Sequence, residues 1–297
     1  MESFIEIIKN SYIGYWNYLK NEILFQSSGL PWYENYFYGL LLISIIIWII
    51  EILFPWRKHQ RIFRKDFFLD AFYMFFNFFL FSLIAYNALS NLFVDLFNKC
   101  LGSFGITNLV AIELGQLPWW SQFLIQFVLA DFIQWNVHRM LHRFPSLWEF
   151  HKIHHSVEQM GFAAHLRFHF METIIYKSIQ YLPLAMLGFG IKDFFIVHMI
   201  ALLIGHINHA NININYGPFK YILNNPVMHI WHHAKKLPEG IYGVNYGISL
   251  SLWDYLFKTA YIPSDGRDVE LGFENSENYP NGFVAQMIQP LKGDKHA

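Results

Sequence analysis

Eight histidines fall into three short clusters, each lying beside a long apolar segment. The clusters are His138-x-x-x-His142, His151-x-x-His154-His155 and His229-x-x-His232-His233. On an α-helix, residues three and four positions apart share one face, so each cluster is expected to point its imidazoles in one direction. Neutral imidazole is a common ligand of zinc, copper and iron. The spacing therefore predicts a metal centre built from three short helical faces.

The number of histidines predicts two metal ions. One ion takes about four to six ligands, fewer than the eight clustered imidazoles. Two further pairs could add ligands: His165 with His169, and His206 with His209. Of these, His169 and His209 are the favoured candidates, and the roles of His165 and His206 stay open.

The residues around the clusters predict where their helices begin and end. Ser146-Leu147-Trp148-Glu149 has the capping-box pattern before His151, and Asn225-Pro226 offers an N-cap and a first-turn proline before His229. Pro145 is expected to end the helix that carries the first cluster.

The composition predicts a membrane protein. Of 297 residues, 54% are hydrophobic and 14% are charged, whereas soluble domains have about 25% charged residues. Cys100 is the single cysteine, which excludes an intramolecular disulfide and Cys-rich metal sites. A net charge of −1 without a basic run gives no reason to expect nucleic acid as a partner.

Long apolar stretches predict an all-α integral membrane protein with about four or more spanning or re-entrant helices. The stretches are 36–54, 67–97, 117–137, 173–190 and 194–207, the last two forming a hairpin turned at 190–193. The first residues lack the features of a cleavable signal peptide, so internal segments are expected to direct insertion.

The distribution of basic residues predicts the topology. Five of them follow the first apolar stretch, which places that loop in the cytoplasm by the positive-inside rule: Arg57, Lys58, Arg61, Arg64 and Lys65. Counting crossings from there places every histidine cluster on the cytoplasmic side. We divide the chain into an N-terminal membrane region (1–118), a catalytic domain (119–260) and a cytoplasmic tail (261–297).

Two acidic residues in apolar surroundings are candidates for the same site. Asp131 lies two helical turns, or ~10 Å, before His138. It could orient an imidazole, face a substrate cavity or bond another helix. Glu172 carries the same alternatives, while Arg167 is expected to pair with lipid phosphates or acids.

Taken together, these motifs resemble the fatty acid hydroxylase and sterol desaturase superfamily of membrane di-iron oxygenases. The resemblance runs from about Leu129 to about Thr259, and includes Arg167-x-His169-x-x-Glu172, His209-x-Asn211, Asn245-Tyr246-Gly247 and Trp253-Asp254-Tyr255-Leu256-Phe257. Phe170 and Lys258 depart from the pattern, where proline and glycine are usual, but neither is a ligand position.

The resemblance implies two iron ions on the cytoplasmic side that activate O₂ against a C–H bond of a membrane lipid, with hydroxylation favoured over desaturation. The implied metal ligands are His138, His142, His151, His154, His155, His169, His209, His229, His232 and His233. The implied catalytic residues are Asp131, Glu172 and Asn211. The chain has no G-x-G-x-x-G, no C-x-x-C and no haem-type domain, so a cytochrome b5- or ferredoxin-type protein is the expected electron donor.

Two other classes remain as alternatives. An intramembrane zinc hydrolase would also use imidazole ligands, although no H-E-x-x-H motif occurs. A bis-histidine haem electron carrier would need paired histidines within facing spans, whereas these histidines cluster at helix ends.

Overall fold

The described part of the chain is helical. The computed structural model describes residues 3–26, 34–189 and 194–292. Within these ranges there is no strand, and extended backbone pairs only at two isolated bridges, Leu223 with Leu250 and Ala234 with Leu271. The prediction of an all-α protein is confirmed for these residues.

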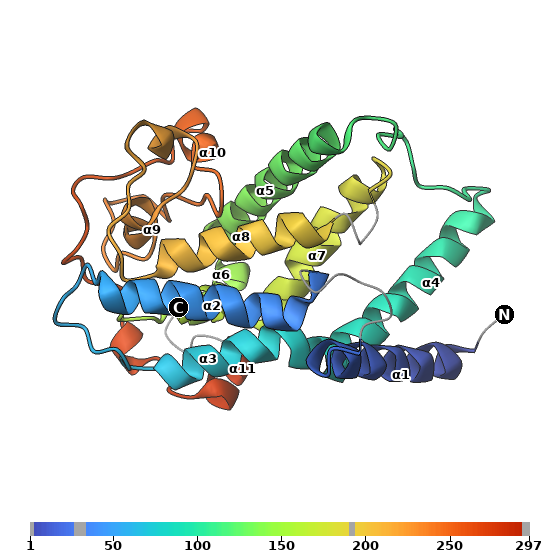
Figure 1. Ribbon diagram of the computed structural model, residues 1–297, viewed down its shortest axis with the longest axis horizontal. Helices are drawn as coiled ribbons and strands as arrows, with labels where there is room; N and C mark the ends of the chain where they lie inside the picture. The colour runs from blue at the N-terminus through green and yellow to red at the C-terminus, as the bar shows by residue number, and fades with distance from the viewer. Residues whose placement is uncertain (1–2, 27–33, 190–193, 293–297) are drawn as a thin grey trace.

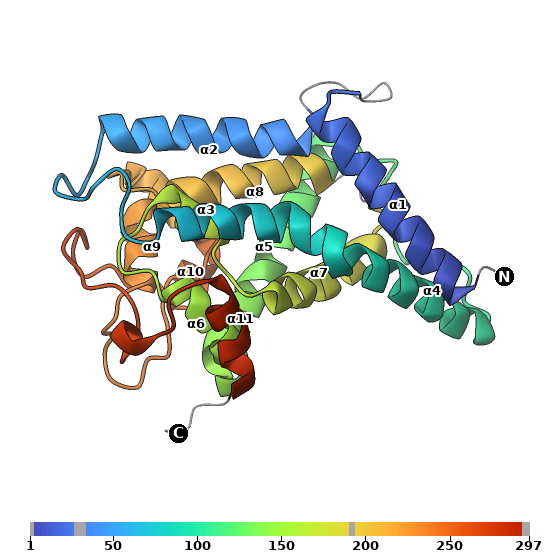
Figure 2. The same cartoon turned by 90° about the horizontal axis from the view of Figure 1, so that it is seen from below.

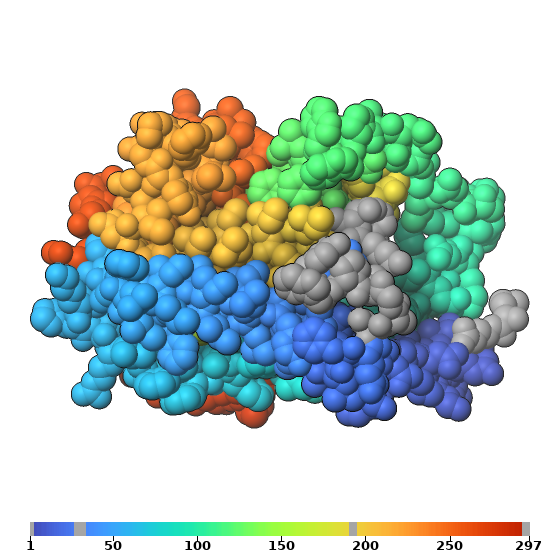
Figure 3. All heavy atoms as spheres, in the orientation of Figure 1, coloured from blue at the N-terminus to red at the C-terminus, as the bar shows by residue number. Residues whose placement is uncertain are grey.

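Two helical segments are long and apolar enough to cross a membrane. One is α2 (Tyr36–Leu53), with a mean hydropathy of 2.3; the other runs unbroken from Phe67 to Ser103, with a mean hydropathy of 1.8. The second contains α3 (Phe67–Phe75), two π-helical stretches (Phe76–Leu80 and Ser82–Tyr86) and α4 (Asn87–Ser103). In α2 only Leu40, Ser44 and Ile47 are buried, and the helix lies across the near face in Figure 3. Such a helix, apolar all round, is suited to lipid.

The other three predicted spans are also helices, but their crossing of a membrane stays a prediction. They are α5 (Trp119–Arg143), α7 (Phe170–Ala185) and α8 (Phe194–His209). The 25 residues of α5 are more polar, and α7 and α8 have 16 residues each, short of the roughly 20 apolar residues that a span needs. The expected turn at 190–193 lies outside the described residues.

The two helices that carry H-x-x-H-H begin close to the predicted positions. In α9 (Pro226–His232) the Asn225 side chain accepts a hydrogen bond from the Met228 amide, which confirms the predicted N-cap. Helix α6 (Pro145–His155) begins at Pro145, which ends the preceding helix as expected. The predicted capping box is wrong: the N-cap is Phe144 and has no side-chain cap, because a first-turn proline starts the helix before Ser146.

The helices form an elongated bundle with the short elements gathered at one end. Helices α2, α3 and α8 run side by side, while α1 (Phe4–Ile23) and α4 pack together at the other end (Figures 1 and 2). The end of the bundle opposite α1 and α4 holds α9, α10 (Leu252–Leu256) and the loops between them. The remaining elements are short 3-10 helices at Phe162–Leu166 (η4), Gly217–Tyr221 (η6) and Ser276–Asn278 (η7), and α11 (Phe283–Lys292). The histidine-bearing ends of α5 and α8 point toward α9 and α10.

Candidate metal centre

Nine buried histidines converge in two adjacent groups. Site A contains His138, His142, His151, His155 and His232. Site B contains His154, His209, His229 and His233. Within each group one nitrogen of every ring lies within 4.8 Å of the others. Four helices, α5, α6, α8 and α9, supply these side chains.

The two H-x-x-H-H motifs are divided between the sites. In α6, the i, i+4 pair His151 and His155 enters site A while His154 enters site B. In α9, the i, i+4 pair His229 and His233 enters site B while His232 enters site A. Each motif was expected to point three imidazoles in one direction. Instead, its i, i+4 pair keeps to one site and the remaining ring turns to the other, which links the two sites through both helices.

Backbone carbonyls fix the orientation of four rings. The Nδ1 atoms of His138 and His232 lie 2.8 Å from the carbonyl oxygens of Tyr246 and Val244. In site B, Nδ1 of His209 lies 2.7 Å from the Gly205 carbonyl oxygen, and that of His154 lies 3.2 Å from the Arg167 carbonyl oxygen. A carbonyl oxygen only accepts, so we assign the hydrogen to each Nδ1. The Nε2 lone pairs therefore point into the sites.

Facing lone pairs make each site fit a cation. Nε2 of His154 lies 3.3 Å from Nε2 of His209, although neither carries a hydrogen to donate. In site A, Nε2 of His138 lies 3.1 Å from Nε2 of His151. Ligand atoms ~2.1 Å from one metal ion are separated by ~3.0 Å in an octahedron and ~3.4 Å in a tetrahedron. These nitrogens therefore have the spacing of ligands that share an ion.

Burial keeps these rings in the form that binds metals. It lowers the pKa of His154 to about 3 and that of His138 to about 4, so both are neutral at pH 7. Several ring nitrogens have no hydrogen-bond partner although they are buried, namely both nitrogens of His142 and the Nδ1 atoms of His229 and His233. Unpartnered buried nitrogen is costly without a ligand, and this favours metal binding at both sites.

Glu172 contacts the histidine site directly. Its Oε2 lies 2.9 Å from Nδ1 of His151, and both side chains are 3% exposed. Burial raises the pKa of the Glu172 carboxyl well above its usual range, and a cation in site A would favour the ionised form. Glu172 is thus placed to orient His151 rather than to reach a substrate.

The other predicted site residues lie apart from the ligand nitrogens. Asp131 accepts hydrogen bonds from the amides of Ser249 and Leu250 and from the indole of Trp253. Asn211 bonds both backbone groups of Arg57. These two residues anchor loops around the site, and neither contacts an imidazole among the contacts described.

His169, predicted as a ligand, lies in neither site. Its Nδ1 accepts from the Met171 amide and caps α7, and its Nε2 lies 3.0 Å from the Met287 carbonyl oxygen. Both nitrogens are therefore occupied, so our proposed ligand set omits it.

His165 and His206 form a pair beside site B. Their Nδ1 atoms are 2.9 Å apart, and Nε2 of His206 lies 3.1 Å from Oγ of Ser44. The His165 ring lies against α8 at Gly205, where a Cβ atom would come within 2.2 Å of it. Glycine is therefore needed for α8 to approach η4 this closely.

Asp254 supports the site but was given no role by the sequence. Its carboxylate accepts from the Tyr246 and Gly247 amides, the Trp135 indole and the Thr259 hydroxyl. It thereby fixes the loop whose carbonyls hold His138 and His232. The sequence feature that could have indicated this role is an acidic residue between two aromatic residues, in Trp253-Asp254-Tyr255.

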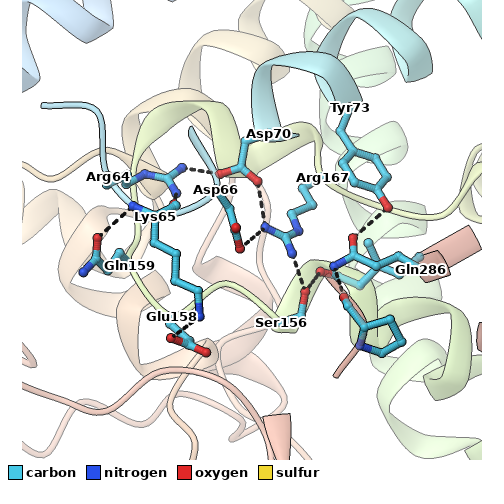
Figure 4. Close-up of polar contacts among 12 residues, drawn as sticks. Arg64, Lys65, Asp66, Asp70, Tyr73, Ser156, Glu158, Gln159, Arg167 and Gln286 are labelled. Carbon is cyan, nitrogen blue, oxygen red and sulfur yellow. Dashed lines mark hydrogen bonds and ion pairs between the residues drawn. The ribbon is translucent and has the colours of Figure 1, made fainter. Parts of the chain in front are cut away.

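A buried ionic network joins the site to α3. Arg167 contacts Asp70 at 3.0 Å, Asp66 at 3.1 Å and the hydroxyl of Ser156 at 3.0 Å, and Asp70 also pairs with Arg64 (Figure 4). The carbonyl of Arg167 holds His154, and Ser156 directly follows His155. Arg167 therefore pairs with acids, one of its two expected roles, and connects both sites to the start of α3.

We expect Glu172→Gln to weaken metal binding at site A. Glutamine keeps the size and one acceptor oxygen but loses the charge that orients and polarises His151, and losing such a partner costs about 10–100-fold in metal affinity. Metal retained after dialysis against a chelator measures the effect. Glu158→Gln, at an exposed partner of Lys65, is the matched control. Unchanged retention in Glu172→Gln would contradict the assigned role.

Part of this chain matches a known protein family. Residues 123–259 match the sequence profile of the fatty acid hydroxylase family. This part of the chain is a fatty acid hydroxylase domain, and it contains all nine histidines of sites A and B.

The similar curated proteins are lipid hydroxylases and monooxygenases. The chain is 35% identical over 182 residues to the ornithine lipid hydroxylase OlsE of Rhizobium tropici, covering 61% of this chain and 54% of that protein. It is 34% identical over 152 residues to the alkylglycerol monooxygenase of Homo sapiens, covering 50% of this chain and 33% of that protein. The Xenopus tropicalis alkylglycerol monooxygenase is 34% identical over 156 residues, covering 51% and 33%. The chain thus spans about half the length of the first relative and a third of the others. No solved structure matches it.

Proposed function

We propose that this chain is a di-iron monooxygenase that hydroxylates a C–H bond of a membrane lipid. The observation that carries the proposal is the pair of sites in which Nε2 lone pairs face one another at 3.1 to 3.3 Å. Two separate histidine groups match two ions, and imidazole nitrogen suits redox iron. The names of the relatives support a lipid substrate and an oxygenase reaction.

The residues of the chain have defined roles in this proposal. Site A and site B would each hold one iron, and the two irons would supply the redox chemistry that activates O₂. Glu172 and the carbonyls of Val244, Tyr246, Gly205 and Arg167 keep the ligand rings in one tautomer and orientation. All nine rings are buried, which excludes water and limits escape of the oxidant.

The reaction balance requires an outside source of electrons. Inserting one atom of O₂ into a C–H bond while reducing the other atom to water consumes two electrons and two protons. We propose that a separate cytochrome b5- or ferredoxin-type protein delivers the electrons.

We favour hydroxylation over desaturation and a polar lipid over a free hydrocarbon. The similar proteins are named for ornithine lipid and alkylglycerol, which both carry a polar group on an apolar chain. The protein is proposed to lie in the membrane through α2 and α3–α4, with the histidines on the cytoplasmic side. The exposed aliphatic face of α2 offers a surface to lipid chains: Leu42, Ile45, Ile46 and Ile49.

Oxygen-isotope labelling tests this proposal. The iron-loaded protein in lipid nanodiscs is given a polar lipid extract, an electron donor and either ordinary or heavy-isotope O₂. We expect one lipid to gain a single oxygen atom whose mass follows the isotope supplied. Loss of two hydrogens without added oxygen would instead show desaturation. A cleaved lipid formed without O₂, together with stoichiometric zinc, would replace the proposal with a zinc hydrolase.

A further inference from the structure

Helix α11 carries an exposed apolar stripe that nothing in the proposed reaction uses. Val284, Ile288 and Leu291 are 65%, 44% and 75% exposed. At about 100° per residue, these three side chains fall within roughly 60° of one another around the helix axis. Gln289 projects about 100° away from Ile288 on the more polar side.

The opposite face of α11 attaches it to the body of the protein. The Phe283 ring lies 4.9 Å from that of Phe72 and 4.5 Å from that of Phe76. The Gln286 side chain accepts a 2.8 Å hydrogen bond from the Tyr73 hydroxyl, as Figure 4 shows. The Met287 carbonyl contacts His169 at the start of α7. These contacts fix which way the exposed stripe faces.

A second group of exposed apolar side chains lies at the beginning of α3. Ile62, Phe63 and Phe68 are 53%, 55% and 72% exposed. The rings of Phe63 and Phe68 stack at 5.6 Å. Phe68 lies one helical turn from Phe72, which contacts α11 through Phe283. Phe72 therefore connects this group of side chains to the attached face of α11 through Phe283.

The direction of α11 matches that of a helix lying on a membrane surface. Figure 2 shows α11 running across the direction of α2 and of α3, which begins the second span-length segment, Phe67–Ser103. A helix in the plane of the membrane surface lies across spanning helices in this way. Exposed Lys58 and Arg61 lie in the loop before α3, and basic residues there favour anionic lipid headgroups.

We propose that α11 is an interfacial helix that docks on the lipid surface through Val284, Ile288 and Leu291. The stripe contacts the headgroups and upper acyl chains of an anionic membrane, into which such a helix inserts by ~5–10 Å. Because α11 also bonds Tyr73 and His169, the contact fixes the orientation of the histidine-bearing end relative to the bilayer. The inference concerns membrane docking and does not depend on the proposed reaction.

Spin-label accessibility tests the docking. In a Cys100→Ser background, Ile288→Cys and Gln289→Cys each carry one nitroxide, and the full chain is reconstituted in phosphatidylcholine–phosphatidylglycerol vesicles. We expect the ratio of collisions with O₂ to collisions with a water-soluble nickel chelate to be several-fold higher at position 288 than at 289. The neighbouring position is the matched control, because both labels sit on the same helix.

Two results would overturn the proposal. Equal ratios at the two positions would mean that the stripe faces water or is covered alike on both sides. Spectral broadening at position 288 that disappears when the protein is diluted with lipid would mean that a second copy of the chain covers the stripe. Native-like unfolding of both labelled proteins confirms that the substitutions leave the fold intact.

Discussion

Replacing His232 or His154 with alanine should abolish lipid oxidation and remove metal from the site that loses its ligand. His232→Ala opens site A and leaves the Nε2 atom of His155 without its 3.1 Å neighbour. His154→Ala opens site B and removes the ring facing His209. We expect activity to fall at least about 100-fold, since disturbing only a partner of a ligand costs about 10–100-fold. Metal content should fall from two ions per chain toward one.

Metal analysis, activity and membrane insertion are measured on the same preparations. His59→Ala, at an exposed histidine in the loop before α3, should leave all three unchanged. Wild-type turnover by either ligand variant would refute the assignment. Loss of activity with full metal content would instead give these histidines a role other than ligation.

Replacing Asp254 should destabilise the fold and disturb site A together. In Asp254→Ala the two amides, one indole and one hydroxyl that now bond the carboxylate lose their acceptor. Each buried donor left without its acceptor costs about 1–3 kcal/mol. Asp254→Asn keeps the shape and some acceptors, so its smaller loss of stability should accompany weaker metal retention at site A. Thermal unfolding and metal analysis measure the two effects.

The matched control for Asp254 is Asp268→Asn. Asp268 is 83% exposed and pairs with Arg267 at the surface, where ion pairs contribute ~1 kcal/mol or less. A wild-type unfolding midpoint and metal content in Asp254→Ala would show that the loop carrying Val244 and Tyr246 is held by other contacts.

Local rules predicted the helices that carry the histidines. Pro145 separates α5 from α6, and Asn225 caps α9, because proline and N-cap residues act within one turn of their own position. The apolar stretches 36–54 and 67–97 correspond to α2 and to the segment containing α3 and α4. Length and hydropathy are properties of a segment by itself, so they can be predicted from the sequence of that segment alone.

The same local rules do not identify the contacts of a side chain that bonds an element distant in the sequence. His169 has the spacing of a ligand, yet it caps α7 and contacts Met287, 118 residues away. Asp131 was placed near His138 by helical rise, but its partners are Ser249, Leu250 and Trp253. Nothing at positions 131 or 169 encodes where those later segments lie.

By itself, the sequence determined that this protein has clustered histidines at helix ends, too many for one ion, in a chain apolar enough for lipid. Helical periodicity fixes which rings share a face, so the sequence predicts that the two rings of each i, i+4 pair point the same way. Only the tertiary structure decided that His154 leaves its own motif for site B and that His232 leaves its own for site A. The physical reason is that a ring lying between two faces of a helix can turn to either site. The neighbouring helices decide which site it joins, and their positions follow from packing of the whole chain.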